Sequence, residues 1–183
     1  VGLQIMRLSC VNPPDSKGVG SCDHRQLCMQ SSVYIKRVCK YVKGAKVVAV
    51  YGGASIENQR NQIKKGAQII VATPGRLLDL INRKIAKLSK VSYVVLDEAD
   101  EMLNMGFQED IDAILKNTPS QKRTWLFSAT MPREVAKIAK RYMKNPVEIT
   151  VGKKNSGAEN ILHVNYIVNE KDRYQALKRI IDY

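Results

Sequence analysis

Residues 93–100 read YVVLDEAD, a short apolar run that ends directly in acidic residues. A nearly continuous apolar run, rather than an alternating one, is typical of a parallel strand covered on both faces. In an open α/β sheet, ligands bind in the crevice at the carboxyl ends of the strands, where Asp97 and Glu98 would lie. Such carboxylates can hold Mg²⁺, but an acidic first helical turn favoured by the helix dipole explains them equally well.

Similar apolar runs recur along the chain and alternate with helical patterns. We predict strands at 46–51, 68–72, 93–96, 124–127 and 147–151, and helices at about 26–41, 55–65, 75–84, 107–116 and 132–143. This alternation predicts an α/β fold with an open, mostly parallel sheet and helices on both faces. Upstream of residue 26 prolines and glycines interrupt the sequence, so we expect the N-terminal strands to be missing or irregular.

The composition is that of an ordinary soluble globular domain, with 44% hydrophobic and 26% charged residues among 183. No apolar run approaches the ~18 residues that a membrane span needs. The charge is unusual, because 30 Lys and Arg stand against 17 Asp and Glu. Residues 1–90 hold 16 bases and 4 acids, a net +12, whereas residues 91–183 hold 14 bases and 13 acids, a net +1. This asymmetry slightly favours a polyanion partner over a merely solvated surface.

A second chemical signal is the stretch TPGR at 73–76, which joins a predicted strand to a predicted helix. Free N–H groups at a helix start, together with an arginine in the first turn, form a phosphate-sized anion site. Taken alone, a capped helix with a surface arginine is the simpler interpretation. The pairs Ser128 with Thr130 and Gly52 with Gly53 also follow predicted strands, and each is compatible with an ordinary turn.

The order of these stretches is more informative than any one of them. The chain has RQLCMQ at 25–30, GG at 52–53, TPGRL at 73–77, DEAD at 97–100, MGF at 105–107 and SAT at 128–130. This order and spacing resembles the first RecA-like domain of the DEAD-box ATP-dependent RNA helicases. The resemblance is continuous from about Arg25 to Tyr183 and implies a RecA-like fold.

The resemblance implies a role for each matching acidic or hydroxyl residue. Asp97 would bind the magnesium of Mg-ATP through water, and Glu98 would activate the hydrolytic water. Asp100, Ser128 and Thr130 would couple the nucleotide state to closure on a second domain.

The same resemblance implies an RNA interface made of Arg25, Gly53, Thr73, Gly75 and Arg76. These residues would contact the phosphate backbone of single-stranded RNA, and they lie in the half of the sequence with net charge +12. Backbone contacts position an RNA without reading its bases, so we expect low sequence preference.

The chain departs from the family pattern near its start. Such a helicase carries a Gly-rich phosphate loop ending in Gly-Lys-Thr or Gly-Lys-Ser, and its backbone N–H groups and lysine cradle the phosphates. Nothing here matches it, because the single Gly-Lys pair, at 152–153, is followed by another lysine. The family's Pro-Thr-Arg-Glu-Leu is replaced by DHRQL at 23–27.

The expected organisation has four parts. They are an irregular segment at 1–25, an incomplete RecA-like ATP-binding domain at 26–151, a polar linker at 152–160, and the start of a second RecA-like domain at 161–183. A lone β-like run and helix in the last part cannot form a domain, so the second domain is expected to be incomplete.

Two functions from different classes remain. The first is a fragment of a cytoplasmic ATP-dependent RNA helicase that uses ATP and Mg²⁺ and acts on single-stranded or duplex RNA. The alternative is a truncated or degenerate RecA-like module that binds RNA without catalysis. The RNA substrate and the oligomeric state are not encoded in any motif recognised here.

We expect the 183-residue chain alone to hydrolyse ATP at no useful rate and to unwind no duplex. Asp97 and Glu98 cannot replace a phosphate loop, because they offer no donors to the β- and γ-phosphates. A magnesium- and RNA-stimulated ATPase assay on this chain checks the expectation. Clear turnover would contradict it.

Overall fold

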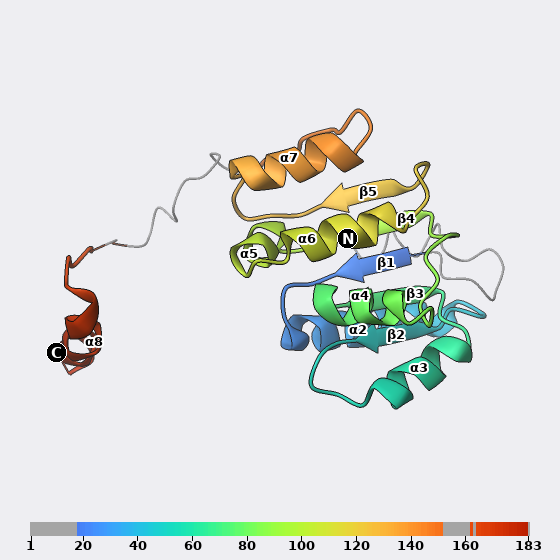
Figure 1. Cartoon of the computed structure of the whole chain (residues 1–183), viewed down its shortest axis with the longest axis horizontal. Helices are drawn as coiled ribbons and strands as arrows, with labels where there is room; N and C mark the ends of the chain where they lie inside the picture. Colours follow the sequence, from blue (N-terminus) through green and yellow to red (C-terminus); the bar gives the residue numbers. More distant parts are fainter. Residues whose placement is uncertain (1–17, 152–161, 163, 183) are drawn as a thin grey trace.

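The computed structural model describes residues 18–151, 162 and 164–182. Its centre is a five-stranded sheet with the order β2-β3-β1-β4-β5, and all neighbouring strands are parallel (Figure 1). The strands are β1 (Gly18–Ser21), β2 (Val47–Val50), β3 (Ile69–Ala72), β4 (Tyr93–Leu96) and β5 (Arg123–Leu126). The predicted open, parallel α/β sheet is therefore confirmed.

The helices follow the strands in sequence. They are α2 (Arg25–Val38), α3 (Ile56–Lys64), α4 (Pro74–Asn82), α5 (Ala99–Asn104), α6 (Gln108–Lys116), α7 (Arg133–Tyr142) and α8 (Arg173–Ile181). Short 3₁₀ helices occupy Cys39–Tyr41 and Glu170–Asp172. Local chemistry marks two helix starts: the Ser55 hydroxyl caps α3, and Pro74 opens α4, where its missing N–H costs nothing.

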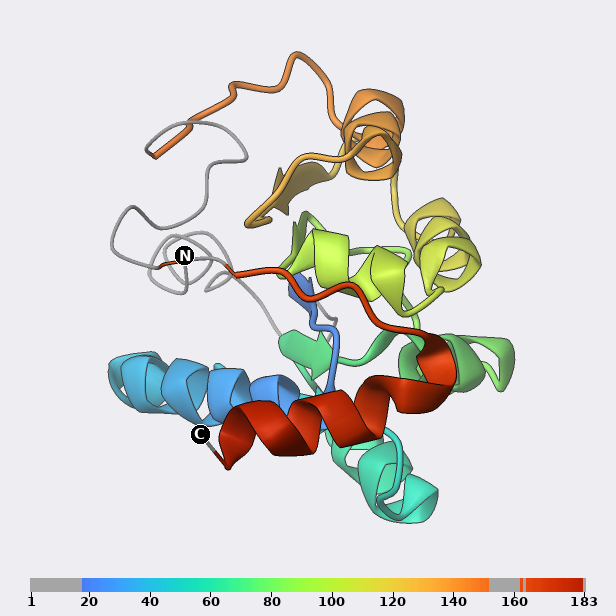
Figure 2. The same cartoon turned by 90° about the vertical axis from the view of Figure 1, so that its left-hand side faces the viewer.

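Alternate residues of each strand face opposite sides of the sheet and enter two separate cores. Ile70, Val94 and Leu96 belong to the larger core, which also receives apolar side chains from α3, α4, α5, α6 and α7. Ile69 and Val71 belong to a smaller core beneath α2. Figure 2 shows α2 on one side of the sheet and α4 and α6 on the other. Helices therefore cover both faces, as predicted.

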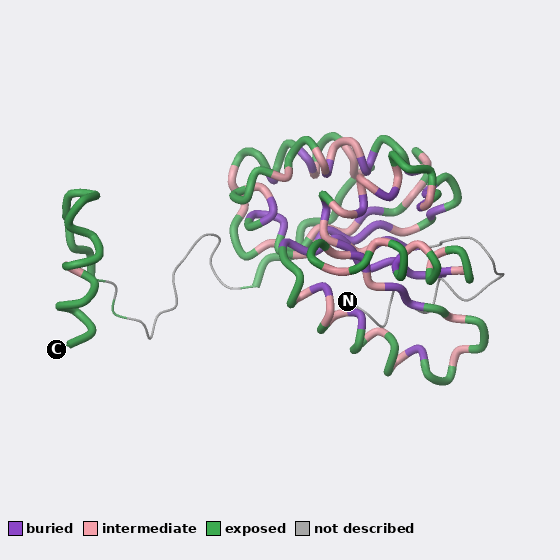
Figure 3. Tube along the Cα trace, turned by 60° about the horizontal axis from the view of Figure 1, so that its bottom comes forward, coloured by how far each residue is buried: buried purple, intermediate pink, exposed green. Residues whose placement is uncertain are grey.

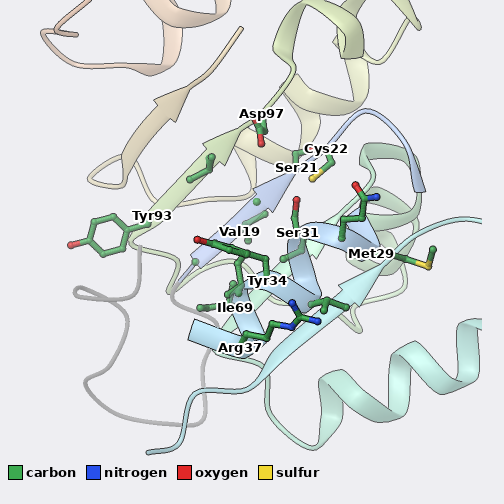
Figure 4. A pocket seen from close by; sticks show the side chains of 17 residues that line it. Val19, Ser21, Cys22, Met29, Ser31, Tyr34, Arg37, Ile69, Tyr93 and Asp97 are labelled. Carbon is green, nitrogen blue, oxygen red and sulfur yellow. The ribbon is translucent and has the colours of Figure 1, made fainter. Parts of the chain in front are cut away.

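A cavity of about 850 Å³ lies on the α2 side of the sheet, lined by β1, β3, β4 and α2 (Figure 4). The strand side chains Val19, Ile69 and Val71, which line it, are nevertheless buried. Figure 4 shows Asp97 beside Ser21 and Cys22 at one end of the cavity, whereas Arg37 lies at the other.

The expectation of no regular strand before residue 26 is wrong for residues 18–21. This segment, GVGS, is β1, the central strand, and it pairs with both β3 and β4. Only Val19 supplies a core side chain, so the residues lack the apolar run that sequence analysis looks for. The contribution of β1 is instead its backbone N–H and C=O groups, which pair with those of β3 and β4.

The predicted strand at 147–151 is also wrong, because these residues form no strand and their side chains are exposed (Figure 3). A β-branched run becomes a strand only where a neighbouring backbone pairs with it. The β-like residues at 164–168 are likewise exposed and pair with no strand in the described part of the chain. The expected helix after residue 169 is confirmed by α8, whereas the linker at 152–160 and residues 1–17 lie outside the described residues.

Candidate functional site

All five strands end in a single row across the sheet. The last residues of the strands pair with one another in the order Val50, Ala72, Ser21, Leu96 and Leu126. Every connection that leaves this row starts at the same edge, where open α/β sheets bind ligands. All ten residues predicted to form a site lie just after the row, in the connections or at the starts of the following helices.

Hydrogen bonds join the connections after β4 and β5. The N–H of Asp100 donates to Ser128 Oγ at 3.1 Å. The N–H and the hydroxyl of Thr130 both donate to Asp100 Oδ2, at 2.9 and 2.6 Å. The three residues that were expected to act together are therefore in direct contact.

This contact sets the charge state of Asp100. Burial by itself would raise the pKa of the carboxyl group, but hydrogen bonds with Thr130 and Ser128 outweigh it and hold the pKa below its usual value. Asp100 also lies in the first turn of α5, where the helix dipole favours a negative charge. Its ionised form thus stabilises the junction of the two connections.

Asp97 and Glu98 have the opposite electrostatic character. Burial raises the pKa of Asp97, and the nearby Asp23 raises it further. Burial also raises the pKa of Glu98, with Asp97 and Asp100 adding to the effect. Glu98 is exposed and has a left-handed backbone with φ of 52°. The connection after β4 therefore holds two carboxylates whose negative charge is poorly compensated.

Asp23 is a buried carboxylate near Asp97 that sequence analysis did not single out. It follows β1 and is only 7% exposed. One oxygen lies 2.7 Å from His24 Nδ1, whereas Oδ1 is buried and has no hydrogen-bond partner in the described part of the chain. The available signal was its position after a strand, but that strand was itself not recognised.

Arg25 and Gly53 lie next to each other although they are far apart in sequence. The guanidinium carbon of Arg25 is 5.2 Å from the centre of the Tyr51 ring, a cation–π contact. Gly53 has φ of 73°, which favours glycine, and a Cβ there would stand 3.4 Å from Arg25 Nη1. The connection after β2 thus reaches the start of α2.

Arg76, at the start of α4, is tied to the same connection. Its Nη1 donates to the carbonyl oxygen of Ala54 at 3.0 Å and to Gln59 Oε1 at 3.3 Å. Within the described residues, its Nε and Nη2 donors have no protein acceptor. A guanidinium has five N–H donors in a planar fork, so the outer ones can bind a phosphate.

Thr73 and Gly75 complete this group at the start of α4. The N–H of Thr73 donates to the carbonyl oxygen of Val50 at 2.9 Å, so the starts of the two connections adjoin. A Cβ on Gly75 would approach Asp110 Oδ2 to 3.4 Å. Arg25, Gly53, Thr73, Gly75 and Arg76 thus gather around the ends of β2 and β3.

The carboxylates do not form a closed metal cage. In the part of the chain that the structure covers, no three His, Cys, Asp or Glu side chains are arranged to hold a metal ion. Mg²⁺ keeps several waters and needs only one or two carboxylates. Asp97, half-buried and poorly compensated, fits that kind of site.

Thr130→Val tests the hydrogen bonds to Asp100. We expect a loss of about 1 kcal/mol of unfolding free energy at pH 7, because the variant loses a donor to a carboxylate. Because the pKa of Asp100 is lower in the folded than in the unfolded chain, ionised Asp100 stabilises the fold at pH values above its unfolded pKa of about 4. This stabilisation is lost as the pH falls through the folded pKa. Urea unfolding at pH 7 and at pH 3 should therefore show a smaller difference at pH 3.

Thr118→Val is the matched control. The Thr118 hydroxyl is buried and donates to the carbonyl oxygen of Leu115 at 2.6 Å, so no titrating group is involved. Its effect should be the same at both pH values. A Thr130→Val effect with no pH dependence would contradict the assignment.

Comparisons with known proteins agree with this arrangement. Residues 3–138 match the family model described as DEAD/DEAH box helicase. The chain is 43% identical over 174 residues to the DEAD-box ATP-dependent RNA helicase CshA of Bacillus subtilis, covering 94% of this chain and 35% of that protein. It is 46% identical over 158 residues to the ATP-dependent RNA helicase CshA of Listeria monocytogenes, covering 86% of this chain and 30% of that protein. The chain thus spans about a third of these relatives.

A solved structure gives the same result. The crystal structure of a DEAD box protein from Methanococcus jannaschii has a TM-score of 0.77 at 39% identity, and the match covers 100% of this chain and 48% of that one. The matched residues include the acidic connection after β4 and the contacts that hold it to the connection after β5. The chain therefore belongs to the DEAD/DEAH-box helicase family.

Proposed function

We propose that this chain is part of a DEAD-box ATP-dependent RNA helicase, in which ATP hydrolysis is coupled to RNA binding and local duplex unwinding. The observation that carries the proposal is the common edge of the sheet. It brings the Asp97–Asp100 stretch to the same side of the domain as the arginine cluster, by which we mean Arg25, Gly53, Thr73, Gly75 and Arg76. Together the two groups come from four different connections. The names of the related helicases support the same activity.

The proposed division keeps 161–183 as the start of a second domain, but the incomplete first domain, expected at 26–151, must also include β1, the central strand of its sheet. Exposed apolar side chains on α8 support this division, because Leu177 and Ile181 are 55% and 72% exposed. An apolar stripe on a helix is normally buried against other elements. We propose that the elements of a second domain bury it.

RNA is the proposed partner of the arginine cluster. Arg25 and Arg76 supply charge, and the outer donors of Arg76 suit a phosphate oxygen. A side chain at Gly53 would crowd the Arg25 guanidinium, because a Cβ there would stand 3.4 Å from Arg25 Nη1. Guanidinium groups match phosphate oxygens, so the proposed contact is with the phosphate backbone, which positions an RNA without reading its sequence.

Mg²⁺ and ATP are the proposed cofactors, with Asp97 holding the metal through water. When bound, the ion neutralises charge on the phosphates of ATP. Asp23 Oδ1 is buried and has no hydrogen-bond partner among the described residues, and the Asp23 and Asp97 carboxylates repel each other; both observations support a cation at this place. No residue here matches the phosphate loop, so the lysine and N–H groups for the phosphates are not assigned.

Glu98 is the proposed base that orients and deprotonates the hydrolytic water. Its exposure gives it access to solvent, and its raised pKa makes it a better proton acceptor than an ordinary carboxylate. Asp100, Ser128 and Thr130 are proposed to pass the nucleotide state to the second domain. Support comes from their hydrogen bonds, which link the connection holding Asp97 to the connection after β5.

We propose a cytoplasmic location, on the basis of the family alone. Along the described stretches, no helix has the length and apolar character that a membrane crossing requires.

Asp97→Asn tests the metal site without any catalytic readout. Because the folded pKa is raised, ionised Asp97 destabilises the fold above that pKa, and the penalty vanishes below the unfolded value of about 4. The free energy of unfolding of the variant should therefore be higher by at least about 0.5 kcal/mol at pH 7 and unchanged at pH 3. Millimolar MgCl₂ should raise the thermal midpoint of the original chain but not of the variant.

Asp79→Asn is the control for this experiment. Asp79 lies on α4 and pairs with Arg83 at 2.7 Å, so the variant should lose a little stability and keep the magnesium response. An equal magnesium response in Asp97→Asn and the original chain would refute the proposed site.

Arg76→Ala tests the RNA interface. We expect affinity for a single-stranded RNA oligonucleotide to fall about tenfold, because a charge-assisted hydrogen bond to phosphate is lost. The slope of log K against log salt should fall by about 0.7, the value for one phosphate on a single strand. Fluorescence anisotropy over a salt series measures both quantities.

Arg83→Ala is the matched control, since Arg83 follows the same helix but lies at its opposite end. It should change neither the affinity nor the salt slope by more than a small amount. If the two arginine variants bind RNA equally well, the proposed interface is wrong.

A further inference from the structure

Gln59 is a buried polar residue that contacts Arg76 of the arginine cluster. It lies on α3 and is only 4% exposed. Its Nε2 donates to the carbonyl oxygen of Tyr51 at 2.9 Å, and its Oε1 accepts from Arg76 Nη1 at 3.3 Å. Both ends of the amide are thus bonded to parts of the candidate RNA interface.

We propose that Gln59 is a positioning residue for RNA binding, which holds the Arg76 guanidinium and the connection after β2 in one fixed arrangement. The inference rests on the proposed function, because it assumes that the arginine cluster contacts RNA. Gln59 itself is too deeply buried to touch the RNA. It acts through the groups that it bonds.

The first consequence concerns the direction of Arg76. Nη1 has two N–H groups, and its acceptors, Gln59 Oε1 and the carbonyl oxygen of Ala54, both belong to the protein. Because the guanidinium is planar, two hydrogen bonds to Nη1 fix the orientation of the whole group. Nε and Nη2 then face away from Ala54 and Gln59. An arginine held in this way loses less side-chain entropy on binding a phosphate than a free one does.

The second consequence concerns the connection itself. The carbonyl group of Tyr51 immediately precedes Gly52, and Gly53 has the positive φ described above. The Tyr51 ring carries the guanidinium of Arg25 at 5.2 Å. One buried amide therefore fixes the surroundings of Arg25, Gly53 and Arg76, three of the five candidate RNA residues.

A second buried glutamine shows what a purely structural role looks like. Gln68 is 6% exposed, and its Oε1 accepts from the N–H of Lys46 at 2.8 Å. Both residues immediately precede strands, so this bond lies at the amino end of the sheet, opposite the candidate site. The two glutamines match in type and burial but differ in position.

The experiment compares Gln59→Met with Gln68→Met, because methionine keeps the size of the side chain and removes its hydrogen bonds. Both variants are expected to lose stability in urea, since each leaves a backbone or side-chain group unpaired. Anisotropy of a labelled single-stranded RNA should show a five- to tenfold weaker affinity for Gln59→Met, and less than a twofold change for Gln68→Met. Equal effects of the two variants on RNA affinity would overturn the inference.

A double variant separates positioning from other effects. Because Gln59 acts partly through Arg76 and partly through the connection after β2, Gln59→Met should weaken binding less in an Arg76→Ala background than in the original chain. A full five- to tenfold loss in that background would overturn the action through Arg76. If Arg76→Ala alone leaves RNA binding unchanged, the proposed function fails, and this result differs from a failure of Gln59→Met alone.

Arg76→Lys provides a test that does not depend on the folding of a Gln59 variant. Lysine keeps the charge, but its three N–H donors share one nitrogen and form no planar fork. The ammonium therefore cannot keep the bonds to Ala54 and Gln59 and also present a second, outward-facing nitrogen to a phosphate. If the held orientation matters, Arg76→Lys should bind RNA nearly as weakly as Arg76→Ala. Binding as tight as that of the original chain would show that charge alone suffices and would overturn the inference.

Discussion

The constraint on which the site depends is the in-register pairing of five parallel strands. Because the last residues of all five strands form one row, every connection that follows begins at the same edge of the sheet. A shift of one residue in any strand would turn its side chains to the opposite face and move its connection along the edge. The central strand β1 matters most, since it holds β3 and β4, the strands that carry the arginine and acidic stretches.

The acidic stretch shows how position alone gives identical side chains different chemistry. Asp97 and Asp100 are three residues apart; Asp97 is half-buried and Asp100 is buried. Asp100 meets donors from Thr130 and Ser128 and is held ionised, whereas Asp97 meets the negative charge of Asp23. Ionised Asp100 therefore stabilises the fold, whereas ionised Asp97 destabilises it.

The sequence predicted much of the fold because long apolar runs and helix starts carry local signals. It failed at β1, where GVGS supplies backbone rather than side chains, and at 147–151, where a β-branched run has no neighbouring strand. It also missed Asp23 and Gln59. Both residues are buried polar groups whose importance comes from partners distant in sequence, and no local pattern indicates such partners.

By itself, the sequence determined the residue types, their order and the charge asymmetry, and these suffice to identify the family. Only the tertiary structure decided which of those residues meet. It placed Arg25 next to Gly53, and it linked Arg76 to the connection after β2 through Gln59. It also brought Ser128 and Thr130 within hydrogen-bond distance of Asp100. The physical reason is that hydrogen bonds and electrostatic shifts depend on distances across the sheet, whereas motifs record only distances along the chain.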